Sequence, residues 1–515
     1  MEDAPGRSTP GTTPRPRSTS APVAMPALGA VPPADASAAA IGKWSAPFDT
    51  GVVAIHASLM PGGSLMLFGT ELEGVDAAPD KQSLSFVSLN PGSTFQHFGK
   101  ALNVSSFCAG NIGLSDGSLF IVGGTGNWDN NRTGGKYGGA NLLARYSEGS
   151  GRIDRYGTSL HKPRWYPSTL DMPDGSILVA GGTDDQGVAV AAPEVVNPAD
   201  GSSRLLTGID MANKGWSYPR MFATSNNDAI MLGNDQRVYK LTVTGTGRVQ
   251  EVSTSQRGKV PLGPAVQVGN KQLLVAGARQ ADGANNLAKL VTVSNSGISV
   301  EDAGTMNIPR VYHELTVLPD GTALATGGNS STDPDDLFAL NKVVYAAERW
   351  TSGKGWKLMA SAAGIRSYHS TALLLPDGSV AKMGSNRPKN MPNYTGEIFY
   401  PPYLYNNDGS VRARPIINSV TRSSLAPRAP LVVTVTPASG KAQERITSLS
   451  MVRIGSATHQ RNFGQRYVKL SFSRRGNVLT ANLPQSAIDT PAGHYMVFAL
   501  DSRGTPSIAK IVKIG

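Results

Sequence analysis

PDGSILVAGGTD (173–184) is the clearest of several similar stretches in this chain of 515 residues. It reads as a turn, a run of apolar residues and a glycine pair. The Asp-Gly and Gly-Gly steps supply the positive φ angles that tight hairpin turns need. The apolar run between them is typical of a short strand that is buried on both faces. The stretch therefore predicts one inner strand of a sheet that packs between other sheets.

The same pattern recurs about seven times, at spacings of roughly 40 to 60 residues. The other copies are PGGSLMLFGT (61–70), SDGSLFIVGGTG (115–126), NDAIMLGN (227–234), GNKQLLVAGA (269–278), PDGTALATGGNS (319–330) and PDGSVAKMGSN (376–386). A period of about 50 residues is that of the kelch propeller. An array of β-sandwiches would not repeat the strand and glycine pair so regularly. We therefore predict an all-β chain with a seven-bladed kelch-type β-propeller over residues 41–412.

The two ends of the chain differ from this repeat. Residues 1–40 are almost entirely Pro, Ala, Ser and Thr, which predicts a disordered arm because such a segment cannot bury enough apolar surface. The arm lacks the basic start and apolar run of a secretory signal peptide. Residues 413–515 instead contain short alternating runs such as LVVTVTP (431–437) and HYMVFALD (494–501). They predict a small C-terminal immunoglobulin-like β-sandwich.

Composition excludes several classes of protein. The 58 glycines follow no G-X-Y period, so they favour a turn-rich all-β protein over collagen. The single cysteine, Cys108, excludes a disulfide framework and any zinc or iron site built from several thiolates. No apolar run approaches the roughly 20 residues that a transmembrane helix needs. We therefore expect no transmembrane segment.

The net charge of +11 is concentrated near the C-terminus. Residues 415–515 hold 13 Lys and Arg but only Glu444, Asp489 and Asp501 as acids. No aromatic-interleaved basic helix accompanies this charge, so we do not expect nucleic-acid binding. Two interpretations stay open: a solvated basic face, or attraction to an anionic cell-surface polymer.

Candidate residues for chemistry are few, because the chain has only seven histidines. His313 and His369 occupy equivalent positions in adjacent repeats, and His459 lies in the C-terminal domain. Taken singly, each histidine is explained as a hydrogen-bonded turn residue. Cys108 by itself is explained as a small buried hydrophobe, and Tyr166 as a core or blade-edge aromatic. Their occurrence together, in this order, suggests a shared functional site rather than separate structural roles.

Together these residues make the chain resemble the copper radical oxidases, the family of galactose oxidase, glyoxal oxidase and related alcohol oxidases. The resemblance runs from about Trp44 to the C-terminus. It rests on Cys108 in FCAG, RWYP (164–167), YHSTALLLPDG (368–378), EIFYPPYLY (397–405) and GSATH (455–459). The third and fifth of these segments are the most specific matches.

The resemblance implies one Cu²⁺ per chain, with Tyr166, Tyr368, His369 and His459 as metal ligands. Imidazole nitrogens and phenolate oxygens suit Cu(II) better than they suit the metals that all-thiolate sites bind. The resemblance also implies a self-formed thioether between Cys108 and Tyr166, which acts as a radical cofactor. For His459 to reach the site, a loop of the C-terminal domain must enter the centre of the propeller.

The reaction implied is oxidation of a small aldehyde, as its hydrate, or of a primary alcohol by O2, with release of hydrogen peroxide. Cys108, Tyr166 and Tyr368 are then the catalytic residues, with Tyr368 as general base. Tyr312 and His313, one repeat earlier, match an aromatic–histidine pair that shapes the pocket or relays protons.

The residue after Tyr218 and the RWYP context of Tyr166 place the chain nearer the glyoxal oxidase branch. In GWSYPRMF (215–222) a proline follows Tyr218, where galactose oxidase has a sugar-binding arginine. GGTDDQGVAV (181–190) lacks the tryptophan that shields the radical in galactose oxidase. We consider Trp128 and Trp216 as substitutes from other loops.

Other functional classes stay open. The chain is alternatively a non-catalytic kelch propeller that binds a partner, or a member of the family that binds copper without turnover. Peroxide release and copper-dependent maturation in air favour an extracytoplasmic protein, secreted or at the cell surface.

Overall fold

The computed structural model describes residues 21–70, 84–97, 105–127, 138–252, 254–255, 260–279, 282–294, 297–388, 391–421, 424–426, 429–438, 445–484 and 486–515. Within them the fold is all-β, as predicted: the one α-helix, α1 (Ala38–Ile41), has four residues. Two short 3₁₀ helices are η3 (Leu340–Lys342) and η4 (Pro402–Leu404). No helix in this part of the chain is long and apolar enough to cross a membrane.

Before residue 413 the described strands form seven sheets of four or more strands, and one two-stranded ribbon. The first three sheets consist of β3 (His56–Leu59), β4 (Leu65–Thr70), β5 (Leu84–Leu89) and β6 (Phe95–His97); β7 (Gly110–Gly113), β8 (Leu119–Val122), β11 (Leu143–Ser147) and β12 (Arg152–Arg155); and β13 (Trp165–Asp171), β14 (Ile177–Thr183), β15 (Glu194–Val196) and β16 (Ser203–Leu205). The ribbon is β9 (Thr125–Asn127) with β10 (Gly138–Gly139).

The fourth to sixth sheets consist of β17 (Arg220–Ala223), β18 (Asp228–Leu232), β19 (Val238–Thr242) and β20 (Arg248–Glu251); β22 (Ala265–Gly269), β23 (Gln272–Ala276), β24 (Asn285–Ser294) and β25 (Gly297–Arg310), with β21 (Thr254–Ser255) added; and β26 (Glu314–Val317), β27 (Ala323–Thr326), β28 (Ala346–Thr351) and β29 (Gly355–Ser361). The seventh joins β30 (Ser370–Leu374), β31 (Val380–Gly384) and β32 (Thr395–Tyr400) to the N-terminal strands β1 (Lys43–Trp44) and β2 (Phe48–Asp49).

Each of the seven repeat stretches forms the second strand of one sheet, namely β4, β8, β14, β18, β23, β27 and β31. The first strands lie nearer the centre, because β7 contacts β13, β13 contacts β17, and β30 contacts both β26 and β3. The glycine pair after the second strand permits close approach between sheets. At Gly327, with φ of 70°, a Cβ atom would collide with the carbonyl of Arg366, which lies just before β30 of the next sheet.

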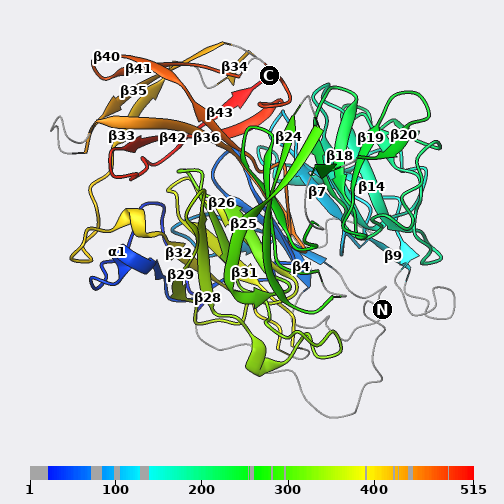
Figure 1. The fold of residues 1–515 in the computed structure, drawn as a ribbon, viewed down its shortest axis with the longest axis horizontal. Helices are drawn as coiled ribbons and strands as arrows, with labels where there is room; N and C mark the ends of the chain where they lie inside the picture. Colours follow the sequence, from blue (N-terminus) through cyan, green and yellow to red (C-terminus); the bar gives the residue numbers. More distant parts are fainter. Residues whose placement is uncertain are drawn as a thin grey trace.

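Residues 21–40 differ from the predicted disordered arm. Met25 is buried, its amide donates to Ser93 O at 3.0 Å, and Gly29 N donates to Asp377 Oδ2 at 2.9 Å. Helix α1 packs against β29 and η4 (Figure 1). This segment is therefore docked on the first, sixth and seventh sheets, while residues 1–20 lie outside the described part.

The C-terminal strands gather at one side of the molecule, at the upper left of Figure 1. They form two sheets, one of β33 (Ile416–Val420), β35 (Pro430–Thr436), β41 (Val478–Asn482) and β40 (Phe472–Arg475), the other of β34 (Ser424–Leu425), β43 (Lys510–Ile514), β42 (Gly493–Asp501), β36 (Ile446–Arg453) and β39 (Tyr467–Leu470). Part of the expected basic face is internal. Arg453, Arg461 and Arg466 are buried, and Arg453 Nη1 lies 2.7 Å from Asp171 Oδ2 of the third sheet.

A hairpin of the C-terminal domain leaves these two sheets and joins the first sheet. It consists of β37 (Ser456–Thr458) and β38 (Arg461–Phe463). β37 pairs antiparallel with β3, with His56 opposite Thr458, and also contacts β7 and β30. The hairpin tip, His459 and Gln460, is thereby carried in among the first strands of several sheets.

Candidate metal centre

The candidate residues occupy unusual backbone positions. Cys108, Tyr166, Tyr312, His369 and His459 all have positive φ, between 44° and 66°. A residue with a Cβ atom in this region costs about 1–2 kcal/mol. Four of them lie within two residues of the start of a first strand, and the fifth lies at the hairpin tip. Such a cluster of backbone strain at one place is characteristic of a functional site.

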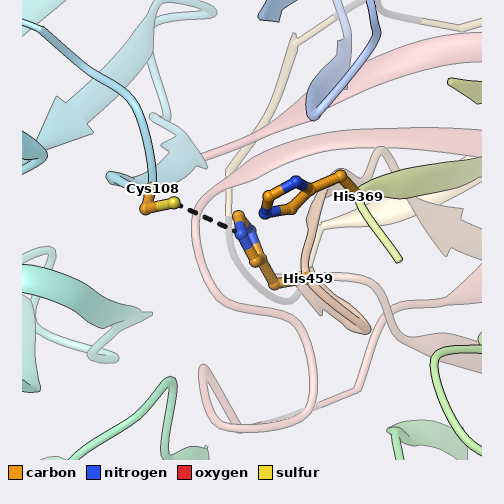
Figure 2. Close-up of side chains that lie close together, drawn as sticks. All are labelled: Cys108, His369 and His459. Carbon is orange, nitrogen blue, oxygen red and sulfur yellow. Dashed lines mark hydrogen bonds between the residues drawn. The ribbon is translucent and has the colours of Figure 1, made fainter. Parts of the chain in front are cut away.

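Three of the predicted residues meet in Figure 2. The sulfur of Cys108 and one ring nitrogen each of His369 and His459 lie within 4.8 Å of one another, and all three residues are buried. Cys108 Sγ is 3.4 Å from His459 Nε2. Sequence positions 108, 369 and 459 are therefore brought together by two different sheets and the hairpin.

Hydrogen bonds orient both imidazoles. His369 Nδ1 lies 2.8 Å from Asn386 Oδ1, an acceptor, so Nδ1 carries the proton. His459 Nδ1 lies 2.6 Å from Thr458 Oγ1, whose own proton goes to Ile55 O at 2.9 Å. Each ring therefore has an unprotonated Nε2 facing the cluster. Among the described residues, His369 Nε2 is buried without any hydrogen-bond partner.

Burial keeps both rings neutral. Loss of solvent lowers the pKa of His369 well below its usual value, and Arg387 lowers it further. Burial likewise lowers the pKa of His459, with smaller contributions from His369 and His56. A neutral imidazole offers the lone pair that a metal ion requires.

Two tyrosines complete the cluster. The hydroxyls of Tyr166 and Tyr368 are in hydrogen-bond contact. The Tyr166 ring stands edge-on to His459 at a centroid distance of 4.9 Å, and the Tyr368 ring stacks on His369 at 3.9 Å. The amide of Tyr166 donates to the carbonyl of Cys108 at 3.1 Å, so these two residues lie side by side on neighbouring sheets.

This donor set fits a copper ion. Two neutral imidazoles meet in a buried space, and one of their nitrogens has no partner in the described chain. The rings of Tyr166 and Tyr368, whose hydroxyls contact each other, pack against these imidazoles. Mixed nitrogen and oxygen ligands of this kind favour Cu(II) over the metals that all-thiolate sites bind. Asn386 and Thr458 supply the outer hydrogen bonds that metal-binding histidines commonly make.

The other predicted residues lie at different distances from this cluster, and one of them is not described. Tyr312 lies against Tyr368, with ring centroids 4.8 Å apart, and stacks on Phe338 at 5.3 Å. His313 is buried, and burial lowers its pKa well below the usual value. Trp216 meets Tyr166 edge-on at 6.4 Å and does not stack on it. Trp128 lies outside the described residues.

Sequence reasoning missed Tyr218 as a member of the site. Its ring stacks on His459 at 4.7 Å and stands edge-on to Tyr166 at 4.8 Å, while its hydroxyl donates to Ala109 O at 3.0 Å. A usable signal was its repeat position, two residues before a first strand, where Tyr312 and Tyr368 also stand. Arg220, two residues after Tyr218, donates to backbone carbonyls such as Pro261 O at 2.5 Å.

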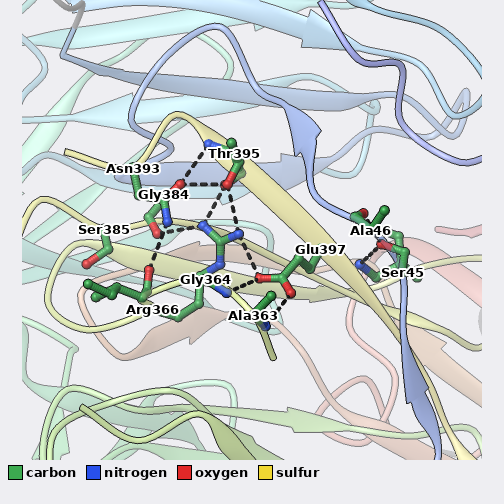
Figure 3. A network of polar contacts seen from close by, with 12 residues as sticks. Ser45, Ala46, Ala363, Gly364, Arg366, Gly384, Ser385, Asn393, Thr395 and Glu397 are labelled. Carbon is green, nitrogen blue, oxygen red and sulfur yellow. Dashed lines mark hydrogen bonds and ion pairs between the residues drawn. The ribbon is translucent and has the colours of Figure 1, made fainter. Parts of the chain in front are cut away.

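A second missed pattern is the arginine two residues before three of these tyrosines. Arg366 Nη2 lies 3.0 Å from Glu397 Oε2, and Glu397 also accepts the amides of Ala363 and Gly364 (Figure 3). We call such a unit an Arg–Glu clamp; the three clamps are Arg164–Glu194, Arg310–Glu348 and Arg366–Glu397, each fully buried. Each clamp fixes the backbone just before Tyr166, Tyr312 or Tyr368.

Comparison with known proteins covers nearly the whole chain. Residues 107–404, more than half of it, match the family described as "Glyoxal oxidase N-terminus", and residues 414–514 match "Galactose oxidase-like, Early set domain". A galactose oxidase of Gibberella zeae is 25% identical over 511 residues, which cover 92% of this chain and 71% of the relative. Aldehyde oxidase GLOX1 of Arabidopsis thaliana is 27% identical over 435 residues, which cover 74% and 69%.

A solved structure shares the fold. It is described as a novel fungal alcohol oxidase with catalytic diversity among the AA5 family, in complex with copper. The two chains superpose with a TM-score of 0.79 at 20% identity, over 92% of this chain and 99% of the other.

Proposed function

This chain belongs to the copper radical oxidase family of the galactose and glyoxal oxidases, and on that premise we propose that it oxidises a small aldehyde or primary alcohol with O2 and releases hydrogen peroxide. The observation that carries the proposal is the convergence of Cys108, His369 and His459 within 4.8 Å. Contact between the hydroxyls of Tyr166 and Tyr368 in the same cluster adds to it.

The residues divide the chemistry between them. Copper, held by Tyr166, Tyr368, His369 and His459, supplies a Lewis acid and a one-electron acceptor when bound. Tyr368 takes the proton of the substrate hydroxyl as general base. The oxidised Tyr166 takes a hydrogen atom from the carbon that bears this hydroxyl. O2 is the final acceptor of two electrons and two protons, which gives hydrogen peroxide.

Tyr166 is suited to this role when it is joined to Cys108. Formation of the thioether removes one hydrogen from the thiol and one from the phenol ring, with O2 as oxidant. The sulfur extends the conjugation of the phenoxyl radical and makes it easier to form. Burial of both residues keeps the radical away from solvent.

We extend the proposal to the fold and the location of the protein. We take the seven sheets to be seven kelch-type blades over residues 41–412, and the C-terminal sheets to be an immunoglobulin-like sandwich over residues 413–515. An extracytoplasmic location is proposed because peroxide is released and copper must be acquired in air. Binding of an anionic cell-surface polymer stays a prediction, weakened by the burial of Arg453, Arg461 and Arg466.

A non-catalytic kelch binding protein is the alternative, and one experiment separates the two. Protein expressed without copper is analysed by intact and peptide mass spectrometry before and after addition of Cu(II) in air. We expect the loss of two hydrogens, mapped to a linked peptide that contains Cys108 and Tyr166. A free thiol after stoichiometric copper binding indicates a member that binds copper without this cofactor, and no copper binding indicates a binding protein.

A further inference from the structure

Two oppositely charged residues lie buried beside the metal centre and have no part in the proposed chemistry. Glu314, the first residue of β26, is 2% exposed, and Lys382 of β31 is 0% exposed. They come from neighbouring sheets. Charged side chains of this kind are almost never fully buried unless a specific partner holds them.

Glu314 holds the hairpin tip. Its Oε1 accepts the backbone amide of Gln460 at 3.0 Å. His459 and Gln460 are consecutive residues with φ of 44° and 63°. Two adjacent non-glycine residues in the left-handed region cost about 1–2 kcal/mol each. A charge-assisted bond to the second amide stabilises this turn, and the turn aims the His459 imidazole.

Lys382 supports the chain next to His369, the other proposed imidazole ligand. Its Nζ donates to Ser370 Oγ at 2.9 Å, and Ser370 Oγ donates to Ser367 O at 2.6 Å. Ser370 directly follows His369, which has φ of 63°. Lys382 therefore supports the chain that carries His369 from the adjacent strand of the same sheet.

The two charges also act on each other. Burial raises the pKa of Glu314 to about 7, and Lys382 opposes this rise. Burial lowers the pKa of Lys382 to about 7, and Glu314 opposes this fall. Each residue is thus the principal counter-charge of the other.

We propose that Glu314 and Lys382 are a pair of positioning residues, in which Glu314 fixes the turn that carries His459 and Lys382 fixes the start of the strand that follows His369. The inference rests on the proposed function for its purpose, which is to hold two imidazoles from separate parts of the chain at one metal ion. Such outer contacts commonly change metal affinity about 10- to 100-fold.

If the two charges served only the stability of the fold, a different result would be expected from replacing both of them. Replacing both members of a buried ion pair by apolar residues often restores stability, whereas removing one member does not. The double variant Glu314→Leu/Lys382→Met therefore separates the two roles. The single variants Glu314→Leu, Glu314→Gln and Lys382→Met complete the set, with Thr316→Val as control. Thr316 lies on the same strand, is buried and has no hydrogen-bond partner among the described residues.

Three measurements are made on the full chain. Hydrogen–deuterium exchange of the peptide covering residues 455–463 is followed in metal-free protein. Cu(II) affinity is measured by competition with a chelator, and the bound ion is examined by electron paramagnetic resonance. The urea midpoint reports overall stability.

We expect Glu314→Leu to speed exchange of that peptide at least about tenfold and to weaken Cu(II) binding about 10- to 100-fold, with altered copper hyperfine splitting. Glu314→Gln keeps an acceptor oxygen and the side-chain shape, so its effects are smaller in the same direction. Lys382→Met weakens Cu(II) binding as well. The double variant regains the urea midpoint but neither the slow exchange nor the affinity.

Opposite outcomes overturn the inference. Wild-type exchange in Glu314→Leu, or full recovery of exchange and affinity in the double variant, shows a pair that serves stability alone. If the wild-type chain binds no copper, the proposed function fails. The exchange comparison in metal-free protein then still decides whether Glu314 holds the hairpin tip.

Discussion

The Arg–Glu clamps and the candidate metal centre are both buried and polar, yet they differ in one respect. The clamp carboxylates find donors in the chain, whereas some imidazole nitrogens in and beside the centre find no partner among the described residues. In the clamps the carboxylate is fully used: Glu348 accepts from Arg310 and from the amides of Asn307 and Ile308. His369 Nε2 in the centre, and both ring nitrogens of the more distant His313, find no partner among the described residues. Native proteins rarely leave buried polar atoms unsatisfied. This contrast fits clamps that serve stability and, under the proposed function, a centre that takes a ligand the chain itself does not provide.

The largest effect is expected from Cys108→Ala. Because this variant cannot form the thioether, we expect oxidase turnover to fall at least about 1,000-fold and the radical absorption to disappear. Copper binding and the urea midpoint should change little, since the four proposed ligands and all clamps are intact. Peroxide release, optical spectra and copper content are measured together. Normal turnover in this variant would refute the radical role of Cys108.

A clamp variant should show the reverse pattern. Glu397→Gln leaves Arg366 as a buried charge without its counter-charge, so we expect a loss of about 3–5 kcal/mol in the free energy of unfolding. Urea denaturation of metal-free protein measures it. Arg366→Met/Glu397→Leu is the control and should recover much of the loss. A stability loss no larger than that of an exposed pair such as Arg237–Glu251 would contradict the distinction between clamps and centre.

Acid should destabilise the centre before the clamps. Burial lowers the pKa of His56 from 6.5 to about 3 and that of His313 well below 6.5. A lowered folded pKa gives stability that is complete above pH 6.5 and is lost as the pH falls from 6.5 toward 3. In metal-free protein we expect the neutral His56 to cost about 2 kcal/mol between pH 7 and pH 5, with a further loss in the same direction from His313. His56→Asn should reduce that slope, and an unchanged slope would show that His56 is not neutral in the fold.

The smallest effect is expected at the edge of the centre. Trp216 meets Tyr166 only edge-on at 6.4 Å, so Trp216→Leu should remove an aromatic contact worth about 0.5–1.5 kcal/mol. Tyr218→Leu removes stacking on His459 as well as contact with Tyr166 and should affect turnover more. Radical lifetime and turnover are compared in the two variants. A larger effect at Trp216 would make it the shield that the sequence suggested.

The repeat was predictable because its signal is local. A turn, an apolar run and a glycine pair fall within about twelve residues of 173–184, and each copy became the second strand of a sheet. Residues 21–40 were misjudged because their docking depends on a few contacts, such as Met25, that composition does not reveal.

The site was only partly predictable. Cys108, Tyr166 and His459 were assembled through family resemblance, since no local pattern links residues so far apart. Glu314 and Lys382 escaped notice because each looks like an ordinary polar residue within its own repeat. Their importance arises only from the amide of Gln460 and the hydroxyl of Ser370, which the fold brings to them.

The hairpin β37–β38 also determines when the proposed metal site can be completed during synthesis of the chain. β3 leaves the ribosome before its edge partner β37, which follows only when residues 456–458 have been made. Until then the proposed copper site lacks His459, so under the proposed function the oxidation that would link Cys108 to Tyr166 is delayed. Under the proposed function, the chain therefore becomes competent to form the thioether only after residue 459 has been made.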